Sequence, residues 1–214
     1  QIEIWRARQS FRYSPDSKLI KPQHAIERLY ALTRDKDVYV TTEVGQHQMW
    51  EAQYFRHDKP RSLITSGGLG TMGYGLPAAI GTQIAHPKSL VVDIAGDASI
   101  LMNIQEMSTA IQYRLPVKVF ILNNQYMGMV RQWQQLFFEN RYSFVELQNP
   151  DFITIAKGFG IAGHTVSDRA DLSDSLDTLL NSDKPYLLEI ICEKEENVFP
   201  MVPAGGCVTS IRLE

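Results

Sequence analysis

The sequence predicts an α/β protein, with a doubly wound, mainly parallel sheet of about six strands and helices on both faces. Short segments rich in Val, Ile and Leu alternate along the chain with helical patterns, as is typical of parallel sheets. The clearest unit is a strand over 90–95, an apolar-periodic stretch over 102–113 and a second strand over 117–122. We expect these two strands to be parallel, with both carboxyl ends at one edge of the sheet.

The other elements follow from apolar periodicity and turn residues. Residues 1 to about 20 are polar, aromatic and turn-rich, and we interpret them as a linker or the tail of a preceding domain. Pro22 suits the first turn of a helix whose Ile26 and Leu29 share one face. Further strands are expected at 37–42, 63–65, near 165 and at 186–191, and further helices near 46–53, 76–85, 127–138, 152–159 and 172–179. Asp151 is expected to cap the helix that follows it.

Composition excludes several classes of protein. The 214 residues are 44% hydrophobic and 21% charged, which is typical of a globular domain. A net charge of −3 and a pI near 6.0 favour neither nucleic acid nor an anionic membrane as a partner. Cys192 and Cys207 lack metal-ligand spacing and are interpreted as reduced thiols. We expect a cytoplasmic protein, with an organellar form left open because a transit peptide would precede Gln1.

Two polar clusters follow the strands of the central unit. Asp97 lies in a Gly-Asp-Ala-Ser segment after the first strand, and Asn124 ends an Asn pair after the second. Open α/β sheets bind ligands at the edge where these side chains would meet. Mg²⁺ uses few protein oxygens and completes its octahedron with ligand phosphates and water. We therefore predict a magnesium-diphosphate site; the alternative is a chance Gly-Asp turn and a chance Asn pair.

A glycine-rich segment offers a competing interpretation. Residues 68–73 satisfy G-x-G-x-x-G, and Asp93 lies 20 residues after Gly73, as in a dinucleotide-binding fingerprint. However, the preceding strand is short and polar, and Asp93 lies inside its strand instead of at the carboxyl end. We favour a glycine-rich turn that allows close approach of the backbone.

Several segments resemble one family, the acetohydroxyacid synthase (acetolactate synthase) catalytic subunits. The segments are GDAS followed by NN, EVGQHQMW at 43–50, TSGGLGTMG at 65–73, GLPAA at 75–79 and GMVRQW at 128–133. The final part, 199–206, is similar to the C-terminal tail of that family. Ala98 departs from the common Gly-Asp-Gly pattern, a small change where φ is negative. The resemblance assigns 1–20 to a linker, 21–195 to a thiamine diphosphate-binding domain and 196–214 to a tail.

The resemblance implies an activity for a longer protein. It would condense two pyruvates, or pyruvate and 2-oxobutyrate, to 2-acetolactate or 2-aceto-2-hydroxybutyrate with loss of CO₂, in branched-chain amino-acid biosynthesis. The implied cofactors are thiamine diphosphate, Mg²⁺ and FAD, the last bound mainly by a domain that this chain lacks. Implied partners are 2-oxoacids, further subunits in a homodimer or tetramer, and a regulatory small subunit. The chain by itself is expected to be inactive.

The resemblance also assigns roles to residues. Asp97, Asn124 and the backbone carbonyl of Tyr126 would bind Mg²⁺. The cofactor would be bound by Val44, Gln46, His47, Gly70, Met72, Ala98, Ser99, Gly128, Met129 and Val130. Met72 would be the apolar wedge that holds the cofactor bent, and Trp133 would shape the acceptor pocket and favour 2-oxobutyrate by ~1–3 kcal/mol. Packing or capping roles remain the alternatives for His47, Met72, Trp133 and residues 128–130.

Two carboxylates, Glu106 and Glu43, are further candidates for catalysis, and three alternative functions of the chain remain open. Glu106 is interpreted as a structural residue in mid-helix, and Glu43 as a residue near the cofactor without a proton to move. Another thiamine-dependent decarboxylase or oxidase would share Asp97 and Asn124 but would not need Trp133. A nicotinamide oxidoreductase would use the turn at 68–73, and a non-catalytic interaction module would tolerate loss of Asp97.

Overall fold

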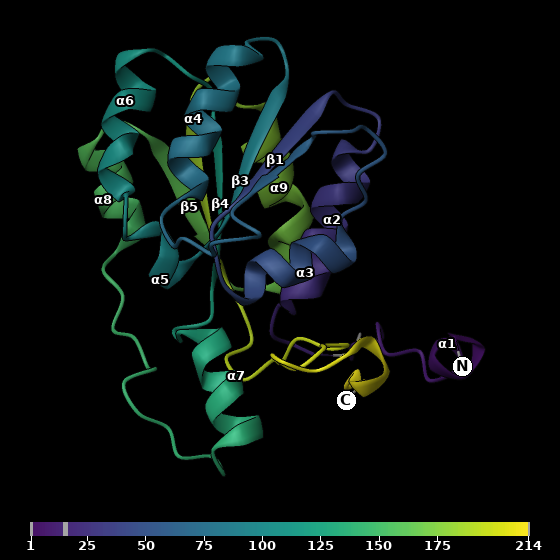
Figure 1. Ribbon diagram of the computed structural model, residues 1–214. Helices are drawn as coiled ribbons and strands as arrows, with labels where there is room; N and C mark the ends of the chain where they lie inside the picture. Colours follow the sequence, from purple (N-terminus) through teal and green to yellow (C-terminus); the bar gives the residue numbers. More distant parts are fainter. Residues whose placement is uncertain (1, 15–16, 214) are drawn as a thin grey trace.

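The computed structural model describes residues 2–14 and 17–213, and it contains one six-stranded parallel sheet in that part of the chain (Figure 1). The strands are β1 Val38–Thr42, β2 Leu63–Thr65, β3 Leu90–Gly96, β4 Lys118–Asn123, β5 Ala162–Val166 and β6 Tyr186–Ile191. Their spatial order is β2-β1-β3-β4-β6-β5, and each neighbouring pair is parallel. The predicted doubly wound α/β fold is confirmed.

Helices cover both faces of the sheet. The α-helices are α1 Ile2–Ala7, α2 Pro22–Thr33, α3 Gln46–Tyr54, α4 Gly75–Ala85, α5 Asp97–Ile100, α6 Met107–Gln112, α7 Gly128–Phe137, α8 Phe152–Gly158 and α9 Leu172–Asn181. Short 3₁₀ helices are η1 Ile104–Glu106, η2 Arg169–Asp171 and η3 Val208–Ser210. One hydrophobic core joins α2, α3 and α9 to the sheet, and a second core joins α4, α6 and α8 to it. The predicted Asp151 cap is confirmed, because its Oδ1 accepts from Thr154 N–H at 2.8 Å.

The central strands β3 and β4 are buried on both faces, which explains their nearly continuous apolar sequences. Phe120 of β4 and Trp50 of α3 are among the largest fully buried side chains of the first core. Each contributes roughly 1.5–3 kcal/mol by leaving water. A rigid pair of central strands therefore fixes the positions of the residues that follow them.

One predicted helix was wrong in its extent. The stretch 102–113 is not one helix: η1 and α6 follow a break at Asn103, whose φ of −139° is not helical and whose Nδ2 donates to the Gly73 carbonyl at 2.7 Å. Glu106 therefore precedes α6 instead of lying in mid-helix, and its Oε2 accepts from Thr109 Oγ1. Residues 1–20 contain α1, a helix that composition did not predict.

Helix α7 and the C-terminal segment lie beyond the carboxyl edge of the sheet, outside the two helical layers (Figure 1). Tyr126 forms an antiparallel bridge with Glu146 just before α7, and Met201 forms another with Arg212. These two segments bound the edge at which the predicted site residues converge.

Candidate cofactor-binding site

One cavity gathers nearly all of the predicted site residues. It holds about 520 Å³ of space, part of it open to solvent, and lies past the carboxyl ends of β1, β3 and β4. Its lining includes Val44, Gln46, His47, Met72, Asp97, Ala98, Ser99, Asn124, Tyr126, Gly128, Met129 and Val130. Of the predicted residues, only Gly70 and Trp133 are outside this lining. The convergence expected from the parallel pairing of β3 and β4 is thus present.

Asp97 is the first residue of α5, directly after β3, and is only 2% exposed. Its Oδ2 accepts from the Gln125 N–H at 2.9 Å and from Asn149 Nδ2 at 2.7 Å. Burial raises the pKa of the Asp97 carboxyl to about 6, although the bond from Asn149 and bonds from backbone N–H groups act to lower it. A bound cation would favour the ionised form of this buried carboxyl.

Asn124 follows β4 and presents its amide to the same cavity. Its Nδ2 donates to Gln46 Oε1 at 3.2 Å, and its Oδ1 accepts from the Tyr126 N–H at 3.2 Å. A Cβ at Gly128 would lie 2.0 Å from Gln46 Oε1 and 2.9 Å from Asn124 Nδ2, so a larger residue there would displace both amides. The sequence did not predict that Gln46 contacts Asn124.

The donor set suits a hard cation. Within residues 2–14 and 17–213, no three His, Cys, Asp or Glu side chains cluster in a way that would hold a metal ion by themselves. One carboxylate and one amide oxygen at a cavity wall fit Mg²⁺ that takes its remaining ligands from phosphates and water. The geometry is thus compatible with Asp97 and Asn124 as ligands, and the role of each remains a prediction.

His47 lies in the first turn of α3 with its ring against Gly96, where an added Cβ would be 2.5 Å from Nδ1. Burial lowers the pKa of His47 to about 3, so its imidazole is neutral at physiological pH. Its Nε2 is buried and unpartnered within the described structure, and the residue lines the cavity. A buried polar atom without a partner is costly in a protein interior, which favours a ligand that hydrogen-bonds to it.

Glu43 connects three parts of the site, a role that sequence reasoning did not find. Its Oε2 accepts from Gly73 N–H at 2.7 Å and Ser99 Oγ at 2.8 Å, and its Oε1 accepts from Leu76 N–H at 3.1 Å. Glu43 therefore fixes the glycine-rich turn that carries Met72 against α5. No local signal distinguishes it, because its partners are 30, 33 and 56 residues away.

Asn149 is the other residue that was missed. Its Nδ2 bridges Asp97 Oδ2 and Asn123 Oδ1, the latter at 3.1 Å. It lies 52 residues from Asp97 in sequence, at the end of the irregular stretch after α7. Only the fold brings the two together, so a sequence pattern could not assign it.

The dinucleotide interpretation does not fit the geometry. Asp93 is fully buried inside β3, and its Oδ1 accepts from Thr41 Oγ1 at 3.0 Å. Its carboxyl is therefore not available to a ribose at the carboxyl edge. The turn itself is occupied as well, because the Gly73 N–H is held by Glu43.

Trp133 and Gly70 lie next to the cavity. A second hollow on the outer face of α7 shares Met129 and Val130 with the first and is also lined by Trp133. The indole is 37% exposed and has an edge contact with Phe137. Gly70 has a φ of +66°, in the left-handed region that favours glycine, and an added Cβ there would lie 3.9 Å from Val44 Cγ1.

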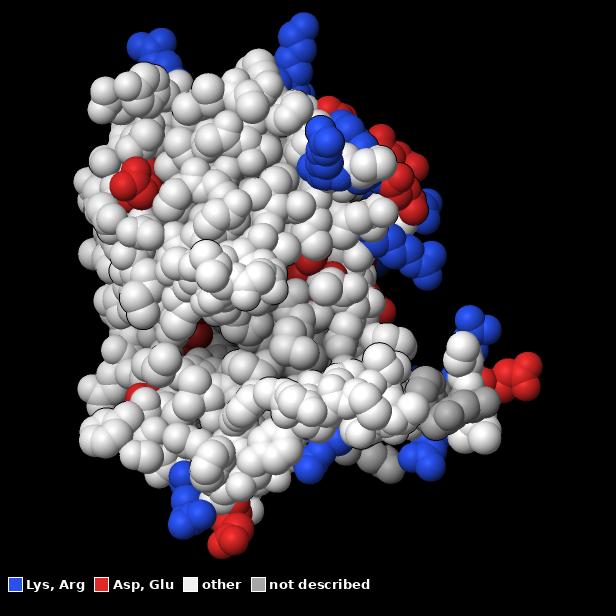
Figure 2. All heavy atoms as spheres, viewed as in Figure 1, with Lys and Arg blue, Asp and Glu red and all other residues white. Residues whose placement is uncertain are grey.

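The distribution of charged side chains on the surface is consistent with the small net charge of the sequence. On the face shown in Figure 2, basic and acidic side chains are scattered around the periphery and much of the centre is uncharged. Among the described helices, none is both long and apolar enough to cross a membrane.

Comparison with known protein families identifies the family to which this chain belongs. A family profile described as "Thiamine pyrophosphate enzyme, C-terminal TPP binding domain" matches residues 43–190, which include both Asp97 and Asn124. The chain belongs to this family of thiamine pyrophosphate-binding domains. The cavity at the ends of β1, β3 and β4 lies within the matched residues, apart from Pro22 and Cys192.

Within that class, the chain is similar to acetolactate synthases along nearly its whole length. It is 52% identical to the mitochondrial acetolactate synthase catalytic subunit of Aspergillus candidus, over 97% of this chain and 30% of the relative. It is 49% identical to the acetolactate synthase isozyme 2 large subunit of Escherichia coli (94% and 37%) and 40% identical to the chloroplastic enzyme of Arabidopsis thaliana (100% and 33%). The chain thus spans about a third of the length of these relatives.

Proposed function

We propose that this chain is the thiamine diphosphate-binding part of an acetolactate synthase. The observation that carries the proposal is the cavity in which Asp97, Asn124 and the unpartnered His47 Nε2 meet. Similarity at about half of all positions to acetolactate synthases across nearly the whole chain supports the specific enzyme. The whole protein would form 2-acetolactate from pyruvate, or 2-aceto-2-hydroxybutyrate from pyruvate and 2-oxobutyrate.

Different residues along the cavity would bind different parts of the cofactor and its metal ion. Asp97, Asn124 and the Tyr126 carbonyl would hold Mg²⁺, and Ala98 and Ser99 would face the diphosphate. Val44, Gln46 and His47 would line the same end, and Gly70 would also contact the cofactor. Met72, Gly128, Met129 and Val130 would contact the pyrimidine end. When bound, thiamine diphosphate supplies the electron sink for decarboxylation of a 2-oxoacid.

The side chains outside the polar end would position substrate and exclude water. Trp133 shares a hollow with Met129 and Val130, which places its indole beside the cavity mouth. A flat apolar surface there would favour the acceptor with one more methylene, 2-oxobutyrate, by ~1–3 kcal/mol. Met72 lines the cavity on a turn that Glu43 holds in place, which suits a rigid wedge.

Organisation and partners are proposed from the relatives. Residues 21–195 form the domain and 196–214 its tail, with FAD bound by a part of the longer protein outside this chain. A homodimer or tetramer would complete the site, and a regulatory small subunit is proposed because the Escherichia coli relatives are named large subunits. The proposed compartment is the cytoplasm or an organelle, since the relatives include bacterial, mitochondrial and chloroplastic proteins.

The test is calorimetric titration of thiamine diphosphate into the chain and its Asp97→Ala variant, with and without Mg²⁺. We expect binding that requires Mg²⁺ and that weakens on the order of 100-fold or more in the variant, because a cation ligand is lost. Asp151→Ala is the matched control, since it removes a helix cap that is not part of the cavity lining. Binding that ignores both Mg²⁺ and Asp97 would contradict the site assignment.

A further inference from the structure

Two buried side-chain amides, those of Gln46 and Gln132, connect Asn124 to the backbone of the segment 196–198. Asn124 Nδ2 donates to Gln46 Oε1 at 3.2 Å, and Gln46 Nε2 donates to Gln132 Oε1 at 2.9 Å. Gln132 Oε1 also accepts from the Val198 N–H at 2.8 Å, and its Nε2 donates to the Val198 carbonyl at 3.0 Å. Gln46 is 3% exposed and Gln132 is fully buried. We call Asn124, Gln46 and Gln132 the amide relay.

Backbone groups determine the orientation of every amide in the relay. A backbone N–H can only donate and a carbonyl can only accept, so Val198 allows Gln132 one orientation. Gln46 is fixed in the same way, because its Nε2 also donates to the Glu196 carbonyl at 2.9 Å. With Nε2 so engaged, Gln46 presents Oε1 to Asn124. Asn124 must then direct Nδ2 toward Gln46, which leaves its Oδ1 on the other side of the amide.

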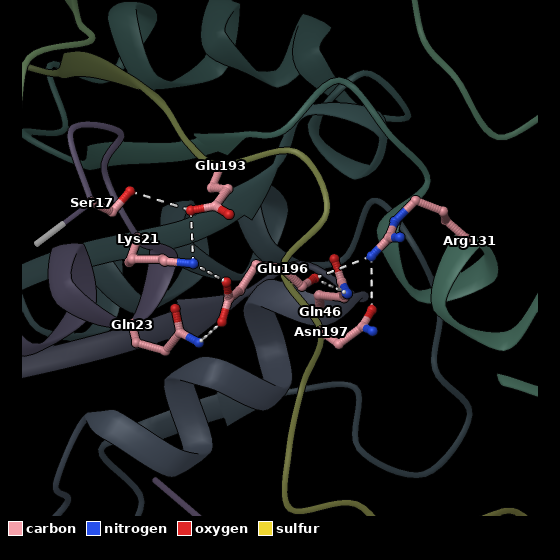
Figure 3. A network of polar contacts seen from close by, with 8 residues as sticks. All are labelled: Ser17, Lys21, Gln23, Gln46, Arg131, Glu193, Glu196 and Asn197. Atoms are coloured by element: carbon pink, nitrogen blue, oxygen red, sulfur yellow. Dashed lines mark hydrogen bonds and ion pairs between the residues drawn. The ribbon is translucent and has the colours of Figure 1, made fainter. Parts of the chain in front are cut away.

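The segment that anchors the relay is itself held firmly (Figure 3). The Glu196 carboxylate pairs with Lys21 and accepts from Gln23 Nε2 at 2.8 Å. From the opposite side, the Arg131 guanidinium of α7 donates to Asn197 Oδ1 at 2.7 Å. The segment 196–198 is thus joined to the start of α2 and the residue before it, and to α7, so it provides a rigid end for the relay.

We propose that Gln132 is a positioning residue for the metal site: through Gln46 it holds the Asn124 amide so that Oδ1, which also accepts from the Tyr126 N–H, keeps its second lone pair for a divalent cation. Gln132 also couples that orientation to docking of 196–198. The proposal rests on the proposed function only in naming the cation that Asn124 binds. Gln132 itself does not line the cavity. Because coupling between sites is reciprocal, the docked segment favours the metal-binding orientation, and a bound cation favours docking of the segment.

Helix α7 contains a matched control. The side-chain amide of Gln134 forms two hydrogen bonds with the backbone of Ser143, as that of Gln132 does with Val198. Its Oε1 accepts from the Ser143 N–H and its Nε2 donates to the Ser143 carbonyl, both at 3.1 Å. This second pair of hydrogen bonds lies on the surface and does not involve Gln46 or Asn124. Gln132→Met and Gln134→Met therefore remove the same kind of interaction from one helix, with and without a connection to Asn124.

The first measurement is amide hydrogen exchange in the 214-residue chain without cofactor. In Gln132→Met, we expect roughly tenfold faster exchange of the Tyr126 N–H, whose acceptor is Asn124 Oδ1. Asn124→Asp tests the relay from its other end, because a carboxylate would face Gln46 Oε1. It should increase exchange of the Val198 N–H. Gln134→Met should change neither amide, and circular dichroism verifies that each variant is folded.

The second measurement is the Mg²⁺ concentration needed for thiamine diphosphate binding. Loss of a partner that orients a metal ligand weakens metal affinity by about 10–100-fold, which we expect for Gln132→Met and not for Gln134→Met. If Gln132→Met alters only Val198 exchange and thermal stability, Gln132 is structural and the proposal is wrong. If Gln132→Met does not fold, unchanged Val198 exchange in Asn124→Asp overturns it. Absence of Mg²⁺-dependent binding in the unmodified chain would contradict the proposed function, while the exchange measurements still decide the relay.

Discussion

The two sides of the cavity differ in how the chain holds them. At the strand ends, Asp97 and Asn124 are buried and each polar side chain is fixed by residues far away in sequence. On the outer side of α7, Trp133 is 37% exposed, and Phe144 in the stretch that follows is 98% exposed. A polar group inside a protein must find a partner, whereas an apolar side chain is tolerated in water. The difference indicates that this chain fixes the polar side of the cavity by its own contacts, whereas the α7 side remains exposed to solvent in this chain.

The strand-end side also contains two neighbouring buried carboxyls that differ in their partners. Glu43 accepts hydrogen bonds from Gly73, Leu76 and Ser99, whereas Asp93 accepts one from Thr41 and its Oδ2 is unpartnered within the described residues. Burial raises the pKa of both groups, and the charge of Glu43 raises that of Asp93 further. Since hydrogen-bond donors favour the charged form of a carboxyl, we expect Glu43 to be the ionised member of the pair and Asp93 to hold the proton.

The largest effect on stability is therefore expected from Glu43→Gln. The new amide group would face backbone N–H donors, and leaving a buried donor unpaired costs about 1–3 kcal/mol of unfolding free energy. Asp93→Asn is the control, because an amide resembles the protonated acid, and its change should stay within about 0.5 kcal/mol at pH 7. Urea unfolding measures both. Equal losses in the two variants would show that the assignment of the proton is wrong.

The pH dependence of Mg²⁺ binding tests the ionisation of Asp97. Its pKa is raised by burial to about 6, so protons compete with Mg²⁺ below that pH, and the apparent affinity should fall roughly tenfold per pH unit. Without metal, the folded chain binds the Asp97 proton more tightly than the unfolded chain does. This group therefore lowers stability as pH rises from about 4 to about 6, and Mg²⁺ should reverse that loss.

Thermal unfolding across pH 4–8, with and without Mg²⁺, provides the measurement. Asp97→Asn is the control, because the amide does not titrate and the Mg²⁺ effect should disappear. An Mg²⁺ stabilisation that is the same at pH 5 and pH 7 would contradict a carboxylate ligand with a raised pKa.

The smallest effect is expected on the α7 side. Phe144 has a φ of +53°, in the left-handed region that Asn tolerates better than Phe, and it is almost fully exposed. Phe144→Asn should therefore leave the unfolding free energy unchanged or raise it by up to about 0.5 kcal/mol. A loss of more than about 1 kcal/mol by urea unfolding would show that this side chain packs within the isolated chain.

Local sequence signals predicted much of the fold for a physical reason. Pro22 marks the start of α2, Asp151 caps α8, and the apolar runs of β3 and β4 match strands buried on both faces. The prediction of one helix over 102–113 was wrong, because a tertiary hydrogen bond from Asn103 to the Gly73 carbonyl competes with helix formation. Short-range patterns cannot report such a contact, which joins residues 30 positions apart.

By itself, the sequence determined the parallel order of β3 and β4, and hence that Asp97 and Asn124 meet at one edge, because connection rules for parallel strands are local and strict. The tertiary structure alone decided which distant side chains are connected to Asp97 and Asn124 by hydrogen bonds. Asn149, Glu43 and Gln132 act across separations of 26 to 86 residues, and their bonds exist only after several elements have packed. The sequence does not reveal how an amide or carboxylate side chain will be oriented. Its orientation is set by the buried backbone donors and acceptors that surround it after folding.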